Sequence, residues 1–261
     1  RHDPDWGFRA AAEKYYRLFP DYFTVRVNRF GNWYYHDLSG LENPEDFGLA
    51  YNEMVTKESV AADHELGYIN FAYTEPWGWW GWALGLKPKE EDPRPTYDEM
   101  IEILNERAAD EEALANGSRS PAHTAHTILN SGVYDIDGKL RLRGGYVARW
   151  GGYNWCLNAS PYAAPEGKLS RFQVTYEWEM EPKLALGADG IYLDSVVNSW
   201  SGVPNYRPDH LERSRHPLTF SSLEPTPAQL GIWHHYEFIE YLSEDQHSRG
   251  RLLMANIFPY N

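Results

Sequence analysis

The segment GADGIYLD, residues 187–194, decides the predicted fold. A glycine-rich turn leads into a short apolar strand whose last residue is an acid, Asp194. Alternation along the strand places Tyr192 and Asp194 on the same face. Catalytic groups of parallel α/β barrels sit at the C-terminal ends of the strands. Asp194 is therefore the first candidate for chemistry, against the alternative that it caps the loop through Ser195, and Asp189 is expected to be a turn or cap residue.

Similar apolar strands lie on both sides of this segment, and helical patterns separate them. Residues 67–75 (GYINFAYTE) and 251–258 (RLLMANIF) predict strands, and 168–186 and 225–248 predict helices. Strands that alternate with helices of about 15–20 residues are typical of parallel βαβ units. The predicted fold class is α/β, a (β/α)8 TIM-type barrel. With about four or five strand–helix units, only part of the eight-stranded barrel is expected here, and the remainder of a longer chain is a candidate partner that completes it.

The chain has 261 residues, and residues 1–261 are expected to form one partial barrel domain, because α/β barrels of about 250 residues fold as single domains. Loop insertions are predicted near 76–95, which contains three prolines, and near 198–225. Further predicted elements are a helix at 8–19, a strand at 21–28, a helix at 96–115 that begins with a Thr96–Glu99 capping pair, and a hairpin at 134–143.

The charge balance argues against two classes of partner. With 24 Lys and Arg against 38 Asp and Glu, the formal charge is −14. A phosphate backbone or an anionic membrane surface requires a basic footprint, so neither nucleic acid nor a membrane is expected as a partner. The sequence shows no apolar run of about 18 residues and no leader pattern. Cys156 is the single cysteine, which excludes an intrachain disulfide and a cysteine-based zinc site.

The aromatic content is high, with 11 Trp, 19 Tyr and 10 Phe. An indole offers a flat, electron-rich face and one N–H donor, which suits the apolar face of a sugar ring as well as core packing. The aromatic residues therefore favour a carbohydrate ligand, and burial of most of them in the core is the competing interpretation. An acidic protein that acts on sugars is more often an exported one, which slightly favours an extracellular or periplasmic location.

The segment GADGIYLD resembles the nucleophile strand of retaining (β/α)8 glycoside hydrolases, broadly the α-galactosidase, α-glucosidase and α-amylase-like barrels, and the Asp-Gly-Val-Tyr-Leu-Asp strand of polygalactosaminidase-like barrels. The resemblance implies hydrolysis of a glycosidic bond in an oligo- or polysaccharide, with Asp194 attacking the anomeric carbon. Amylase-like enzymes carry Arg where this chain has Tyr192. Chitinase-like barrels carry acids where it has Tyr192 and Val196. These residues do not select one family.

A glycosidase needs a second carboxyl group that serves the leaving group as an acid. Glu75 closes the strand at 67–75 on the face that carries Phe71 and Tyr73, and desolvation by such a face raises a carboxyl pKa. In the α-galactosidase-like barrels that the chain resembles, the acid/base lies on a strand after that of the nucleophile, which here would lie beyond Asn261. Glu75 is thus predicted either as the acid or as a substrate-binding residue.

Candidate substrate-binding residues lie near the predicted strand ends. The run WGWWGW at 77–82 alternates indoles with glycines, which leave the indole faces exposed on a loop. Neutral amides that donate and accept hydrogen bonds suit polyol recognition. Packing of the indoles and loop capping by the amides are the competing interpretations. The predicted substrate-binding set is Trp77, Trp79, Trp80, Tyr192, Asn158, Asn198, Trp200, Asn256 and Asp37.

Neither a metal nor a cofactor is expected. His123 and His126 have helical spacing but no third ligand nearby, and no phosphate-binding loop or dinucleotide fingerprint occurs in the sequence. The predicted partner is an oligo- or polysaccharide substrate. Two rival functions remain open: a carbohydrate-binding barrel module without catalysis, and an α/β domain whose tryptophans only pack. The last predicts that Trp79 and Trp80 are buried and that no groove passes Asp194.

Overall fold

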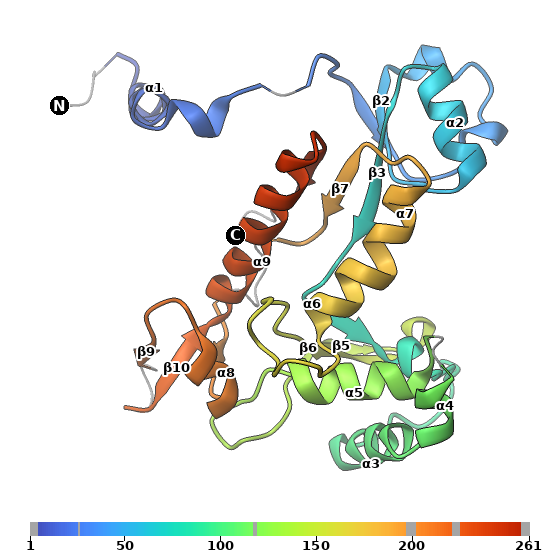
Figure 1. Ribbon diagram of the computed structural model, residues 1–261, viewed down its shortest axis with the longest axis vertical. Coiled ribbons are helices and arrows are strands. Elements are labelled where there is room, and N and C mark those ends of the chain that lie inside the picture. The colour runs from blue at the N-terminus through green and yellow to red at the C-terminus, as the bar shows by residue number, and fades with distance from the viewer. Residues whose placement is uncertain (1–4, 26, 117–118, 197–201, 221–224, 257–261) are drawn as a thin grey trace.

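The computed structural model describes all residues except 1–4, 26, 117–118, 197–201, 221–224 and 257–261. The protein is a mixed α/β structure built on a five-stranded parallel sheet (Figure 1). Each strand of this sheet lies beside the preceding sheet strand along the chain. The strands are β1 (Asn32–Tyr34), β2 (Leu49–Asn52), β3 (Ile69–Thr74), β7 (Gly190–Leu193) and β11 (Leu252–Ala255), in that order.

The predicted α/β class and parallel pairing are confirmed, whereas the closed barrel is not shown. In the part of the chain that the structure describes, β1 and β11 form the two edges of an open sheet. The central pair is β3 and β7, in which Tyr73 stands opposite Tyr192. The two strands that were predicted to end in an acid, β3 before Glu75 and β7 before Asp194, therefore lie side by side. Their C-terminal ends point in the same direction.

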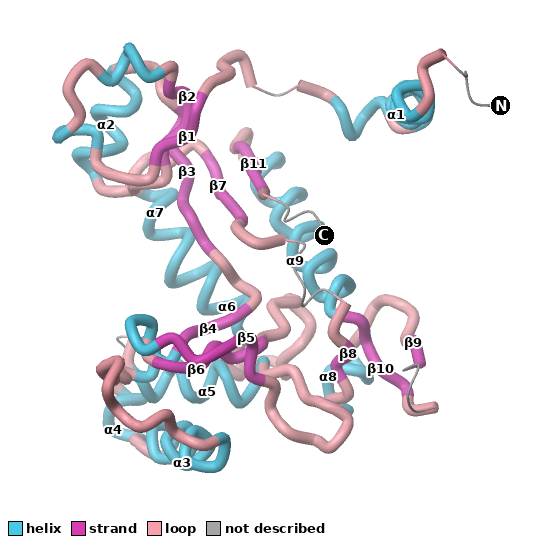
Figure 2. Tube along the Cα trace, turned by 180° about the vertical axis from the view of Figure 1, so that it is seen from behind, coloured by secondary structure: helices cyan, strands magenta, loops and turns pink. Residues whose placement is uncertain are grey.

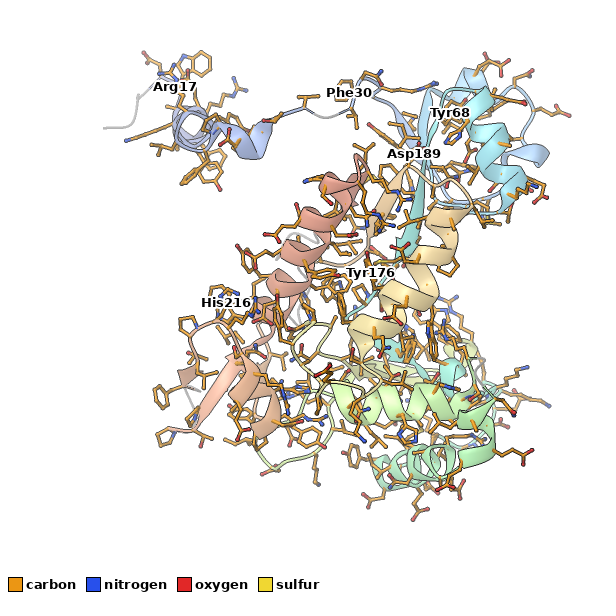
Figure 3. All side chains as sticks on the ribbon, in the orientation of Figure 1. Arg17, Phe30, Tyr68, Tyr176, Asp189 and His216 are labelled. Carbon is orange, nitrogen blue, oxygen red and sulfur yellow. The ribbon has the colours of Figure 1, made fainter. Side chains whose placement is uncertain are left out.

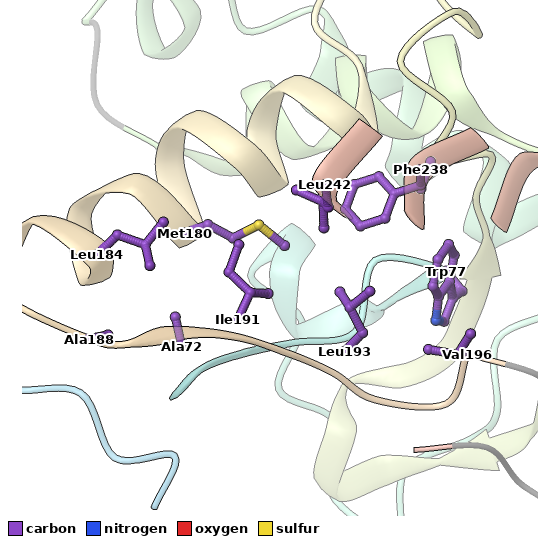
Figure 4. Close-up of a cluster of buried hydrophobic side chains, with 11 residues drawn as sticks. Ala72, Trp77, Met180, Leu184, Ala188, Ile191, Leu193, Val196, Phe238 and Leu242 are labelled. Atoms are coloured by element: carbon purple, nitrogen blue, oxygen red, sulfur yellow. The ribbon is translucent and has the colours of Figure 1, made fainter. Parts of the chain in front are cut away.

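Helices cover one face of the sheet (Figures 1 and 2). They are α2 (Lys57–Glu65), one continuous helix made of α6 (Arg171–Gln173), a π-helical stretch (Val174–Met180) and α7 (Glu181–Ala185), and α9 (Gly231–Ser248). Ile191 and Leu193 face these helices and pack with Leu184 and Phe238 in the main core (Figure 4). Burial of such a side chain stabilises the fold by about 1.5–3 kcal/mol. The alternate positions, among them Tyr73 and Tyr192, lie on the opposite face.

A second folded unit, 78–156, is inserted after β3. Its antiparallel sheet packs on helices around a separate core that contains Trp79, Leu104, Ile128 and Trp155. The predicted insertion near 76–95 is the beginning of this larger unit, and the predicted helix at 96–115 is divided in two. The elements are β4 (Gly78–Trp80), α3 (Tyr97–Ala108), α4 (Glu111–Ala115), α5 (Pro121–Ser131), β5 (Leu142–Val147) and β6 (Gly152–Cys156).

A smaller insertion follows β7 in the region predicted near 198–225. It forms a three-stranded sheet and one short helix. The predicted helix from 225 begins only at Gly231, because residues 227–230 pair as a strand. The elements are β8 (Pro204–Asn205), α8 (Pro208–Arg213), β9 (Thr219–Phe220) and β10 (Pro227–Leu230).

The N-terminal region stands apart from the rest of the molecule (Figure 1). Its helix α1 (Phe8–Leu18) is close to the prediction for 8–19. The predicted strand at 21–28 is wrong: Pro20–Phe23 form a 3-10 helix, and Val25 is 69% exposed. Strand propensity is realised through packing against neighbouring strands, and the sheet begins only at Asn32.

Candidate functional site

A cavity of about 920 Å³ lies at the C-terminal ends of β3 and β7. This volume is within the range of sites that hold small ligands. Tyr73, Glu75 and Asp194 come to it from the sheet, while the inserted unit and the helix 171–185 supply its other walls. The two predicted catalytic carboxylates thus line the same cavity.

Asp194 is half-buried and presents its carboxylate beside the hydroxyl of Tyr73, which donates to its Oδ2 at 2.9 Å. The backbone on either side of the carboxylate is fixed. Its N–H donates to the carbonyl of Thr74 at 3.0 Å, and its carbonyl accepts from Nε1 of Trp77 at 2.9 Å. Among the described residues, Asp194 has no ion pair with a cationic side chain. The carboxylate is therefore positioned but not neutralised.

The turn after Asp194 is held by the neighbouring strand. Ser195 has a φ of 58°, in the left-handed region that costs a residue with a side chain about 1–2 kcal/mol. Its N–H donates to Oδ1 of Asn256 at 2.7 Å, and Nδ2 of Asn256 donates to the hydroxyl of Tyr192 at 2.8 Å. Asn256, which follows β11, therefore fixes the turn and is absent from the described cavity lining.

The other acid of the motif, Asp189, lies at the opposite end of β7 (Figure 3). It accepts from the backbone N–H of Asn70 at 2.8 Å and pairs with Nε2 of His64 at 3.0 Å. These contacts tie β7 to β3 and α2. They agree with the predicted role in the turn, and they place Asp189 away from the chemistry proposed for Asp194.

Glu75 is ion-paired with Arg143 of β5, with 2.8 Å between Oε1 and the guanidinium. An adjacent cation favours the ionised form of a carboxyl. This arginine lies 68 residues away in sequence and was not considered in the sequence analysis of Glu75.

Glu53, which directly follows β2, is the carboxyl group that the sequence analysis missed. Burial, followed by the charge of Asp194, raises the pKa of Glu53 to about 7 from an ordinary 4.5, despite a hydrogen bond with the Trp33 side chain. Its Oε2 is buried without a hydrogen-bond partner in the described part of the chain. The sequence contains a signal for Glu53. The short apolar segment LAYN is followed directly by this acid, just as GIYL is followed by Asp194.

Aromatic rings join the two carboxyl groups across four strands. The ring of Tyr192 contacts that of Tyr73 at 5.6 Å between centroids and that of Trp33 at 6.0 Å, both edge to face. Trp33 reaches Glu53 and Tyr73 reaches Asp194 through the hydrogen bonds described above. Tyr192 thus contacts one aromatic neighbour of Glu53, Trp33, and one of Asp194, Tyr73.

The tryptophan run is divided between core and cavity. Trp77, 2% exposed, stacks on His235 at 3.8 Å in the core, so its predicted sugar contact is wrong. Trp79, 4% exposed, and the half-buried Trp80 both line the cavity, as does Trp82, which is 53% exposed. The packing-only interpretation required both Trp79 and Trp80 to be buried and Asp194 to be without a groove. Trp79 is buried as it requires, but Trp80 is only half-buried and Asp194 lines the cavity.

Of the other predicted binding residues that the structure describes, Asn158, Asp37 and Tyr192 are absent from the described cavity lining. Asn158 is 1% exposed and contacts His210 and Gln229 inside the molecule, so its role is structural. Asp37 is exposed. Asn198 and Trp200 lie outside the described residues.

A buried charge network closes the cavity on the side of the helix. The guanidinium of Arg171 donates to Glu179 at 3.0 Å and to the carbonyls of Pro76 and Glu75, both at 3.1 Å. Glu179 also pairs with Arg119 at 3.1 Å. Burial alone would raise the pKa of Glu179, but the charges of Arg171 and Arg119 outweigh it and lower that pKa. Glu179 lies in the π-helical stretch, an irregularity frequent at functional sites.

Among the described residues, no group of three or more His, Cys, Asp or Glu could hold a metal ion. Within the same residues, every helix is too short or too polar to span a membrane. Comparison with protein-family models, curated proteins and solved structures finds no match to this chain.

Proposed function

We propose that the protein is a glycoside hydrolase that cleaves a glycosidic bond in an oligo- or polysaccharide, with Asp194 as the nucleophile. The observation that carries this proposal is the place of Asp194. It closes a central parallel strand, lines a cavity of about 920 Å³ with tryptophan walls, and accepts a hydrogen bond from Tyr73 without a cationic partner among the described residues. Active sites of α/β barrels occupy this position.

The proposal includes a (β/α)8 barrel, of which the described sheet is part. Five parallel strands follow one another in chain order, and their helices cover one face. In a barrel the helices form the outer ring and the opposite face lines the interior. Tyr73 and Tyr192 lie on that opposite face, which supports this assignment.

This mechanism assigns Glu53 as the acid, because its charge interacts with that of Asp194, although Glu53 is not among the residues of the described cavity lining. An acid must hold a proton at working pH, and a pKa of about 7 allows it. Glu75, paired with Arg143, is assigned to substrate binding.

In the first step, the Asp194 carboxylate bonds to the anomeric carbon while the glycosidic C–O bond breaks and Glu53 gives its proton to the leaving oxygen. In the second step, water attacks the anomeric carbon, the ester to Asp194 breaks, and Glu53 takes a proton from the water. Both carboxyl groups return to their starting states, and the configuration at the anomeric carbon is retained.

The test measures release of reducing ends from a panel of oligo- and polysaccharides by the wild-type protein, by Asp194→Asn and by the exposed control Asp98→Asn. Loss of at least about 10³-fold in turnover is expected for Asp194→Asn alone, with an unchanged circular-dichroism spectrum. Unchanged turnover in Asp194→Asn would refute the assignment. Glycan binding by a wild-type protein that cleaves no glycan would favour the non-catalytic module.

A further inference from the structure

The charge of the cavity is opposite to that of the whole protein. The chain carries a formal charge of −14, yet the described cavity wall contains four cationic side chains against three carboxylates, a net charge of +1. The cations are Arg119, Arg143, Arg171 and Lys183, and the carboxylates are Glu75, Glu179 and Asp194. Such a local reversal concentrates anions at a site within a protein that otherwise repels them.

The positive charge is not evenly neutralised. Arg143 and Glu75 form one balanced pair. Glu179, in contrast, forms ion pairs with both Arg171 and Arg119, so these three side chains together carry a net charge of +1. The side chain of Arg171 is 2% exposed and also donates to two backbone carbonyls, whereas that of Arg119 is 35% exposed. The guanidinium within reach of a ligand is that of Arg119.

Lys183 supplies a second cation without a counter-ion. Its ammonium donates to the carbonyl of Tyr73 at 3.0 Å, and no carboxylate of the described residues lies within 4.0 Å of it. An ammonium has three donors. Burial lowers the pKa of Lys183, and the more distant charges of Glu179 and Glu53 only partly offset that effect. Lys183 and Asp194 both line the cavity, the lysine bonded to the backbone carbonyl of Tyr73 and the carboxylate to its hydroxyl.

Trp79 fixes the orientation of the Arg119 guanidinium. The guanidinium lies over its ring at 4.9 Å, and that of Arg171 lies at 4.3 Å from the same ring. A stacked guanidinium keeps its edge available for planar acceptors such as carboxylate. Arg119 is therefore oriented before any ligand arrives, which lowers the entropy cost of binding.

We propose that this cavity binds a glycan that carries an anionic substituent, a carboxylate or a sulfate, and that Arg119 and Lys183 hold the substituent. The placement of this group beside the scissile bond rests on the proposed glycoside hydrolase function. One anionic substituent balances the net charge of +1 on the described cavity wall, and charge-assisted hydrogen bonds to it are stronger than those to sugar hydroxyls. With a neutral glycan, Arg119 keeps only the Glu179 carboxylate that it shares with Arg171, and Lys183 gains no anion.

The test is calorimetric titration of the full chain with Asp194→Asn, which separates binding from turnover. The ligand pairs are oligogalacturonides and their methyl esters for the carboxylate arm, and carboxyl-reduced chondroitin sulfate oligosaccharides and their desulfated forms for the sulfate arm. We expect at least one anionic glycan to bind about 10-fold or more tightly than its neutral form, and the difference to shrink with added salt. Which arm responds identifies the substituent.

Substitutions then locate the contact. Arg119→Gln and Lys183→Met are each expected to weaken anionic binding about 10-fold, a typical effect for one charge-assisted hydrogen bond, and to leave binding of the neutral form unchanged. The matched control Lys168→Met, at an exposed position outside the described cavity lining, should change neither. Arg119→Lys should restore part of the affinity. If Lys183→Met does not fold, Arg119→Gln, at a partly exposed side chain, decides the question alone.

The outcomes separate the two proposals. Equal binding of charged and neutral glycans, binding of neither, or equal losses in Lys168→Met and Lys183→Met would each overturn the anionic site. Preferential anionic binding by a wild-type protein that turns over no glycan would keep the anionic site and remove the glycoside hydrolase function. Hydrolysis of neutral glycans alone would do the reverse.

Discussion

The hydroxyl of Tyr73 donates a hydrogen bond of 2.9 Å to Oδ2 of Asp194, across the central pair of strands. Tyr73 stands opposite Tyr192 in this pairing, so the bond runs diagonally to the residue two positions further on. Burial and then the charge of Asp194 raise the pKa of Tyr73 well above its ordinary value, which keeps the hydroxyl a donor. The carboxylate of Asp194 is oriented by a group that stays protonated.

Tyr73→Phe should reduce kcat about 10- to 100-fold and change KM little, because the lost hydrogen bond holds a charged group in position. Steady-state kinetics on the substrate found by the glycan panel measure this split. Tyr51→Phe is the matched control, since its hydroxyl bonds to the carbonyl of Arg29 at 2.7 Å, away from Asp194. An equal loss in both variants would contradict a specific role for Tyr73.

Glu53 should give a measurable dependence of stability on pH. The folded protein binds the Glu53 proton more tightly than the unfolded chain does, so the free energy of unfolding falls as the pH rises from about 4.5 to about 7. Above about 7 this group adds no further slope. Glu53→Gln should remove the slope, and the exposed control Glu65→Gln should keep it, as measured by urea unfolding at several pH values.

The same proton should appear in the kinetics. If Glu53 is the acid, kcat/KM of the wild-type protein falls above a pH of about 7, because the donor is then ionised. The rate of the Glu53→Gln variant should be about 10²- to 10⁴-fold lower, and its kcat/KM should no longer fall above this pH. If kcat/KM of Glu53→Gln still falls as the pH rises, the proton belongs to another group, and Glu75→Gln is the next variant to measure.

Asn256→Ala should destabilise the protein by about 1–3 kcal/mol, because it leaves the Ser195 N–H without its acceptor and the Tyr192 hydroxyl without its donor. Asn256→Asp keeps the acceptor and should recover part of the loss. Asn105→Ala, at an exposed position of α3, should change the free energy of unfolding by no more than about 0.5 kcal/mol. Thermal unfolding of the three variants measures the series, and equal effects of Asn256→Ala and Asn105→Ala would contradict the role of Asn256.

Arg171→Met should destabilise the protein by about 3–5 kcal/mol, because Glu179 loses one of its ion-pair partners and two backbone carbonyls lose their hydrogen-bond donor. Arg17→Met is the control. Its ion pair with Glu13 joins two exposed side chains on α1, and such pairs contribute at most about 1 kcal/mol. Urea unfolding measures both, and a loss below about 1 kcal/mol for Arg171→Met would contradict the network.

Local patterns predicted several elements well. Thr96 and Glu99 form both hydrogen bonds of the predicted capping box, and α3 begins at the next residue, Tyr97. Alternation along β7 correctly placed Tyr192 on the face opposite to Ile191 and Leu193, because side-chain direction in a strand follows from the backbone alone. The strand β2 was not predicted, since its four residues, LAYN, are too few for a periodic signal.

The sequence by itself determined the parallel α/β class and the position of Asp194 at a strand end, because strand and helix periods and chain direction are local properties. Tertiary structure alone decided which carboxyl group holds a proton. Burial and neighbouring charges set a carboxyl pKa, and the charge of Asp194 that helps to raise the pKa of half-buried Glu53 comes from a segment far along the chain. The ion pair of Arg143 with Glu75 likewise joins positions 68 residues apart. The cationic wall that Arg119 and Lys183 form in an acidic protein likewise exists only in the folded chain.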